Sequence, residues 1–93
     1  MVFRYDLSDN LKDKIKKLSK KDPLLIDILY KKINEIISQT PETIEHYKNL
    51  RNELSNRMRV HIGKSHVLTF VYYKQDNFIL FWDFAHHDEI YKK

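Results

Sequence analysis

Hydrophobic residues near the start of the chain change from an alternating pattern to a helical one. Residues 2–7 alternate weakly between apolar and polar side chains, which predicts a short β-strand. After them, Ser8 or Asp9 can cap a helix whose apolar residues recur every three or four positions. Those apolar residues are Leu11, Ile15 and Leu18. A first helix is therefore expected directly after the strand.

A second helix is predicted to follow at once. Asp22 can cap it, and Pro23 suits its first turn, where the missing N–H group costs nothing. Its apolar stripe consists of Leu25, Ile28, Leu29, Ile33, Ile36 and Ile37. We expect the helix to end near Gln39, to pack antiparallel to the first helix, and to give way to a short helical turn at Pro41. Residues 46–54 should form a connection.

The last third of the chain has the period of two that is typical of β-strands. Strands are predicted over residues 57–62, 66–73 and 78–84, and together they would form an antiparallel meander. The first of these strands has one apolar face and one cationic face. Its apolar residues are Met58, Val60 and Ile62, and they alternate with Arg57, Arg59 and His61.

The turns between these strands decide which side chains share a face of the sheet. Glycine in the first position favours a two-residue turn at Gly63 and Lys64, which places His61 directly opposite His66. A second turn centred on residues 75–76 would pair Val67 with Phe84, Thr69 with Trp82 and Val71 with Leu80. Under this register, His61 and His66 lie on the same face.

The same register predicts one covered face and one open face. The two helices would cover Met58, Val60, Ile62, Val67, Val71, Phe78, Leu80, Trp82 and Phe84. The open face would carry Arg57, Arg59, His61, His66 and Asp83 at one end, and Phe70, Tyr72, Ile79 and Phe81 at the other. We therefore expect Trp82 to be core, and an amphipathic partner to cover the second, apolar group.

Length and composition are those of one small folded domain spanning residues 1–93. The chain is 42% hydrophobic, which is ordinary for a globular protein. It has no cysteine, which excludes disulfides and thiolate metal sites and suits a cytoplasmic location. No apolar run approaches the roughly 20 residues that span a bilayer, so no membrane association is expected. The pattern predicts an α+β fold with two helices on one face of a mainly antiparallel sheet.

Positive charge is concentrated early in the chain. Seventeen Lys and Arg against thirteen Asp and Glu give a net charge of +4, which favours polyanionic partners. Residues 12–21 carry six lysines and one acid. This segment fits a solvated helix face and a phosphate-binding surface equally well.

The residues expected on the open face could cleave RNA without a metal. Such cleavage needs a base for the 2′-hydroxyl, an acid for the 5′-oxygen and cations for the charged transition state. Histidine suits the proton transfers and arginine suits the charge. The adjacent residues His86 and His87 point apart on either a strand or a helix, so a zinc site is not expected there.

Three segments, combined with the order of elements, resemble a known family. They are HYKNLRNEL at residues 46–54, RMRVHIGKSHVLTFVY at 57–72 and AHHDEIYKK at 85–93. The order of strand, helical hairpin and three-stranded antiparallel meander is similar to that of the RelE/ParE superfamily of toxin–antitoxin toxins. The resemblance covers nearly the whole chain and implies a RelE-like fold.

The resemblance also implies a set of catalytic residues. Arg59 and His61 match basic positions that RelE-type nucleases have on the strand before the turn. His66 and His87 stand where the common pattern has arginine, and Tyr91 matches a carboxy-terminal tyrosine. The expectation is proton transfer by His66 and His87, with Arg59 stabilising charge and Tyr91 orienting the nucleotide. Substrate-binding roles are expected for Arg57, Lys64 and His86.

By resemblance, the protein is a metal-independent and cofactor-free endoribonuclease that cuts mRNA on the ribosome and so inhibits translation. Its partner would be a RelB-like antitoxin in a toxin–antitoxin hetero-oligomer. The alternative is a catalytically weak or inert binding module of the same fold, such as a ParE-like inhibitor of DNA gyrase. His87 and Tyr91 favour the nuclease, because a gyrase inhibitor would not need proton-transfer residues there. A plain basic RNA-binding protein is a third interpretation.

Overall fold

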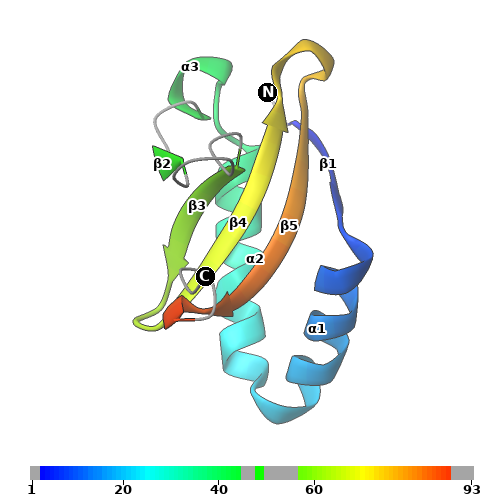
Figure 1. Ribbon diagram of the computed structural model, residues 1–93, viewed down its shortest axis with the longest axis vertical. Helices are drawn as coiled ribbons and strands as arrows, with labels where there is room; N and C mark the ends of the chain where they lie inside the picture. Colours follow the sequence, from blue (N-terminus) through cyan, green and yellow to red (C-terminus); the bar gives the residue numbers. More distant parts are fainter. Residues whose placement is uncertain (1–2, 45–47, 50–56, 89–93) are drawn as a thin grey trace.

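The computed structural model describes residues 3–44, 48–49 and 57–88. Its elements, in order, are β1 (Arg4–Leu7), α1 (Asp9–Lys21), α2 (Pro23–Ile37), α3 (Pro41–Ile44), β2 (Lys48–Asn49), β3 (Arg57–Ile62), β4 (His66–Tyr73), the 3₁₀ helix η2 (Lys74–Asp76) and β5 (Phe78–His86). In the described part of the chain the strands form one sheet in the order β1-β5-β4-β3-β2. β1 runs parallel to β5 and the other neighbours are antiparallel. Figure 1 shows α2 behind the sheet, with the opposite face towards the viewer.

The helical hairpin begins where the sequence predicted. The Ser8 hydroxyl caps α1 by accepting the Leu11 N–H at 3.1 Å, and the Asp22 carboxylate caps α2 by accepting the Leu25 N–H at 3.2 Å. Pro23 occupies the first turn of α2, as expected. Within these ranges, neither helix combines the length and apolar composition that crossing a membrane requires.

The core lies between the two long helices and one face of the sheet. The side chains that fill it from the helices include Leu11, Leu29, Ile33 and Ile36. Those from the sheet include Ile62, Leu68, Phe70, Ile79, Phe81 and Phe84. Met58 and Val60 pack against this cluster, so the predicted apolar face of β3 is confirmed. Burial of this shared apolar surface holds the helices on one side of the sheet.

The predicted two-residue turn between β3 and β4 is wrong. The turn contains Gly63, Lys64 and Ser65, so Ile62 pairs with His66 and His61 pairs with Val67. Gly63 has φ of 62°, a left-handed conformation that glycine adopts without strain. Because side chains alternate along a strand, the extra residue moves every β4 side chain to the opposite face. His61 and His66 therefore lie on opposite faces of the sheet.

The same shift removes the exposed apolar area that the sequence suggested. Phe70, Ile79 and Phe81 are fully buried beneath the helices, and Tyr72 packs against the core at its edge. Trp82 was expected in the core but is 38% exposed. The argument for a partner covering those four residues therefore fails.

β5 contains a bulge that the sequence did not indicate. Near the 74–77 turn the predicted register is correct, and Val71 pairs with Leu80. Beyond a register shift between Thr69 and Phe70, Thr69 pairs with Asp83 instead of Trp82. The strand continues to His86, two residues further than predicted. Two pairings were also not foreseen: β1 beside β5, and β2 within the segment expected as a connection.

Candidate functional site

β3 supplies cationic side chains to the sheet face that the helices leave open. Arg57, Arg59 and His61 alternate with core residues, so all three lie on this face. The two arginines are partly exposed and His61 is exposed. This part of the prediction is confirmed: the cationic side of β3 faces away from the helices.

His87 reaches the same face from the end of β5. Its backbone N–H donates to the Ser65 carbonyl at 2.6 Å, which ties the end of β5 to the β3–β4 turn. The His87 ring stacks on the His61 ring with centroids 5.9 Å apart and planes 24° apart. The His87 side chain is 49% exposed. Two imidazole rings from distant parts of the chain thus lie side by side on the solvent-accessible surface of the open face.

His66 and His86 form a second pair on the other side of the sheet. They are cross-strand neighbours with ring centroids 5.7 Å apart. His66 also stacks on Phe84, a core residue, at 5.2 Å. His66 and His87 were expected to act together, but His66 is separated from His61 and Arg59 by the sheet itself. Packing at the edge of the core accounts for the position of the His66 ring.

Asp88 lies beside both terminal histidines. One of its carboxylate oxygens is 3.6 Å from Nδ1 of His87, and the other is 3.8 Å from Nδ1 of His86. Its backbone N–H donates to Nδ1 of His86 at 3.2 Å. The backbone becomes helical at His87 and Asp88. Asp88 is 85% exposed, so solvent screens its contact with either histidine.

Trp82 and Arg57 form a contact that the sequence analysis missed. Cζ of Arg57 lies 4.2 Å from the centre of the Trp82 ring. The β5 bulge turns Trp82 to the open face, and a bulge of this kind leaves no clear trace in an alternating sequence. The sequence predicted the position of Arg57 on the open face correctly. It assigned Trp82 to the core, so it could not predict the contact.

Asp83 belongs to the structural framework and not to the open face where it was expected. Its Oδ1 is 2.7 Å from Nζ of Lys14 and 3.2 Å from the side-chain nitrogen of Asn10. It also accepts the Phe84 N–H at 2.8 Å. Asp83 therefore fixes α1 against β5.

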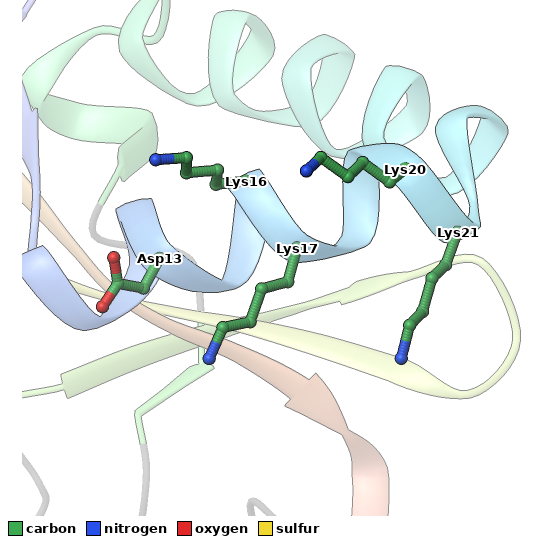
Figure 2. Close-up of a pocket in the computed structure, with 5 residues that line it drawn as sticks. All are labelled: Asp13, Lys16, Lys17, Lys20 and Lys21. Carbon is green, nitrogen blue, oxygen red and sulfur yellow. The ribbon is translucent and has the colours of Figure 1, made fainter.

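Lysines of α1 line a shallow groove on the surface of the protein. Figure 2 shows Lys16 and Lys20 extending from one flank of the helix, and Lys17 and Lys21 from the other, with Asp13 nearby. Within the described residues these four lysines form no salt bridge, whereas Lys12, Lys14 and Lys32 each have a carboxylate partner. The groove therefore carries a local excess of positive charge.

Two remaining predicted residues lie outside this arrangement. Lys64 is exposed in the β3–β4 turn. Tyr91 falls outside the described residues, so its expected place beside His87 stays a prediction. In the described part of the chain, no three histidine or carboxylate side chains gather closely enough to hold a metal ion.

Comparison of the whole sequence identifies relatives. No family profile matches the chain. It is 41% identical over 92 residues to a protein of Methanocaldococcus jannaschii named "Putative toxin RelE4", a match that spans 99% of this chain and 94% of that one. The chain belongs to the RelE family of toxins. A second relative, an uncharacterized protein of Methanosarcina mazei, is 34% identical over 90 residues, 97% of this chain and all of that one.

Solved structures confirm the RelE-like fold. The toxin–antitoxin complex RelBE2 of Mycobacterium tuberculosis matches with a TM-score of 0.73 and 15% identity, covering 94% of this chain and 93% of that one. A metal-bound toxin of Helicobacter pylori matches with a TM-score of 0.72 and 20% identity, covering 96% and 99%. The predicted α+β architecture, with helices on one face of the sheet, is therefore confirmed. The protein is a RelE-like toxin of a toxin–antitoxin system.

Proposed function

We propose that this RelE toxin is a metal-independent endoribonuclease that cleaves mRNA through the RNA's own 2′-hydroxyl. The observation that carries the proposal is the stacked pair of His61 and His87 on the cationic open face. Two accessible imidazoles can supply both proton transfers of the reaction, and neighbouring arginines can stabilise its charge.

The reaction needs one proton taken and one proton given. The 2′-oxygen attacks the adjacent phosphorus as one imidazole removes its proton. The bond to the 5′-oxygen then breaks, and the second imidazole, in its protonated form, gives that oxygen a proton. With ring centroids 5.9 Å apart, His61 and His87 can reach oxygens of the same phosphate. The products are a 2′,3′-cyclic phosphate and a free 5′-hydroxyl.

Charge develops on the phosphate oxygens in the transition state. Arg59 lies one alternation from His61 on the same face of β3 and is proposed as the cation that stabilises this charge. Tyr91 is proposed to orient the nucleotide, and Lys64 to contact the strand near the turn. The expected role of His86 is not proposed, because His86 pairs with His66 on the other side of the sheet. His66 has no part in this proposal, because its ring packs on Phe84 at the other face.

We propose that cleavage takes place on the ribosome. The lysine groove of α1 is on an element that covers the other side of the sheet, so a single substrate strand on the open face would not need it. Groups of lysines bind phosphates without regard to sequence. Ribosomal RNA is large compared with this toxin, and its phosphates can contact the lysine groove while the mRNA strand lies on the open face.

The proposed cellular partner is a RelB-like antitoxin, in a cytoplasmic hetero-oligomer. Support comes from family membership and from the RelBE2 neighbour, which was solved as a toxin–antitoxin complex.

The deciding experiment maps mRNA ends after the toxin is expressed. Primer extension should find new 5′ ends with the unaltered protein and none with His87→Ala, while both proteins accumulate and bind antitoxin equally. In a reconstituted translation mixture, the upstream fragment should end in a cyclic or 3′-phosphate. Inhibited DNA supercoiling without new mRNA ends would instead assign the toxin to gyrase inhibition.

A further inference from the structure

The contact between Arg57 and Trp82 spans three strands of the sheet. Arg57 is on β3 and Trp82 on β5, and β4 lies between them. Adjacent strands are about 4.8 Å apart, so the two side chains must extend across β4 to meet at 4.2 Å. β4 is covered along this face: Thr69 and Val71 are 3% and 5% exposed, and Val67, which pairs with His61, is fully buried.

The backbone beneath Trp82 is held firmly in place. The Ser8 hydroxyl donates to the Trp82 carbonyl at 2.6 Å, and the Ser8 N–H donates to the Phe81 carbonyl at 2.9 Å. Asp83, the next residue, is anchored to α1 through Lys14. The backbone at Phe81 and Trp82 is thus held by Ser8, at the junction of β1 and α1, and Asp83 is held by Lys14 of α1. With its neighbours fixed in this way, the indole is directed to the open face. Bulges commonly re-aim one side chain in this way.

A large aromatic ring in this position is well suited to a ligand with a flat face. Trp82 remains 38% exposed, and Arg57 is only partly buried. A guanidinium is planar, so when one of its faces lies on the indole, a second flat group can stack on the other. The positive charge of Arg57, with Arg59 and His61 on the same strand, favours a ligand that also carries phosphates.

We propose that Arg57 and Trp82 form a stacking platform for one base of the RNA strand whose phosphate lies at His61 and His87. This inference rests on the proposed ribonuclease function. Arg57 and His61 are four residues apart along β3, about 13 Å, a span that a short run of nucleotides can cross. The stacked base is therefore near the cleaved bond but not part of it.

The platform explains how the strand can be held without recognition of its sequence. Stacking on aromatic and guanidinium planes tolerates every base, because each has a flat π face. The platform fixes the strand at a second point, so that the phosphate is presented to the histidines in one orientation.

The first test compares substitutions of Trp82 in cleavage of ribosome-bound mRNA. Trp82→Leu keeps an apolar cover over β4 but removes the π face, whereas Trp82→Phe keeps both. Stacking is worth about 1 to 3 kcal/mol per base, so Trp82→Leu should lower kcat/KM by roughly 5- to 150-fold. Trp82→Phe should retain most of the activity. Tyr30→Leu, which removes a similarly exposed aromatic ring from α2, should change nothing.

The second test uses the fact that Trp82 is the protein's single tryptophan. A short 2′-O-methyl RNA, which has no free 2′-hydroxyl and cannot be cleaved, should quench tryptophan fluorescence as it binds. A series of the same oligonucleotide with one abasic nucleotide should locate the stacked base, because quenching is lost at that position alone. Arg57→Lys keeps the charge without the planar group and should weaken binding of the intact oligonucleotide while barely affecting the abasic one.

The outcomes separate this inference from the function on which it rests. If His87→Ala abolishes cleavage while Trp82→Leu cleaves as fast as the unaltered protein, the platform is wrong and the nuclease stands. RNA that binds without changing the tryptophan fluorescence would also contradict the platform while leaving the nuclease intact. If both His61→Ala and His87→Ala cleave at full rate, the proposed function itself is lost.

Discussion

At the scale of single residues, the histidines in the described part of the chain have different surroundings. Two stacked rings, His61 and His87, meet on the open face, where both are accessible. His66 is packed on Phe84 instead, and His86 contacts His66 across the strands. All four residues are histidines, so only their surroundings distinguish the proposed catalytic pair, His61 and His87, from a histidine that packs against the core.

Substituting these histidines one at a time should therefore give opposite results. His61→Ala and His87→Ala should each lower cleavage by about 100- to 10,000-fold, the usual loss for a general acid or base, and should relieve growth arrest. Their thermal stability should change little, because both side chains are exposed.

His66→Ala is the matched control. It should cleave nearly as fast as the unaltered protein but unfold at a lower temperature, since a ring is removed from the edge of the core. Cleavage rates of purified toxins on ribosome-bound mRNA, with melting curves alongside, measure both effects. An inactive but stable His66→Ala would restore His66 as a catalytic residue and contradict the site described above.

At the scale of elements, hydrophobic periodicity was enough to place both long helices and the last three strands. It worked because caps, apolar stripes and alternation are local signals, and Ser8, Asp22 and Pro23 act within a few residues of their own positions. The parallel pairing of β1 with β5 could not be found in this way. That pairing joins residues more than 70 positions apart, and no local pattern encodes it.

The candidate site was only partly predictable, for a specific physical reason. The sequence placed Arg57, Arg59 and His61 correctly on one face of β3, because alternation within a strand depends on that strand alone. Whether His66 joins them depends on the turn, and one additional turn residue moved it to the other face. The bulge near Trp82 had the same effect: it changed the face on which Trp82 lies, so the contact between Trp82 and Arg57 was not predicted.

The turn itself gives a prediction at this scale. Gly63 has φ of 62°, and a Cβ added there would meet no atom within 4 Å, so only the backbone conformation opposes a larger residue. Gly63→Ala should lower the free energy of unfolding by about 1 kcal/mol, whereas Gly63→Asn should lower it less, since asparagine tolerates left-handed backbone. Urea denaturation measures both, and equal stability of all three proteins would mean that the turn adopts another conformation.

At the scale of the whole molecule, positive charge lies on two separate surfaces. The open face carries the cationic residues of β3, and the lysine groove lies on α1, a helix that packs on the covered side of the sheet. A substrate strand occupies the first surface in the proposed mechanism. The second surface is free to bind phosphates of a larger RNA, so the two should contribute differently to activity.

The final prediction separates these contributions by changing charge in the groove alone. The double substitution Lys16→Gln, Lys20→Gln removes two charges from one flank of the groove. The control Lys12→Gln, Lys31→Gln removes the same number from outside it, so both proteins have equal net charge.

If the groove binds RNA phosphates, the first variant should associate more weakly with ribosomes, and the slope of log K against log salt should fall by about 1 per lysine. The loss should be uniform across mRNA sequences, because phosphate contacts carry no base information. Cosedimentation with ribosomes over a salt series measures the slopes, and identical slopes for the two variants would mean that net charge, rather than the groove, attracts the toxin.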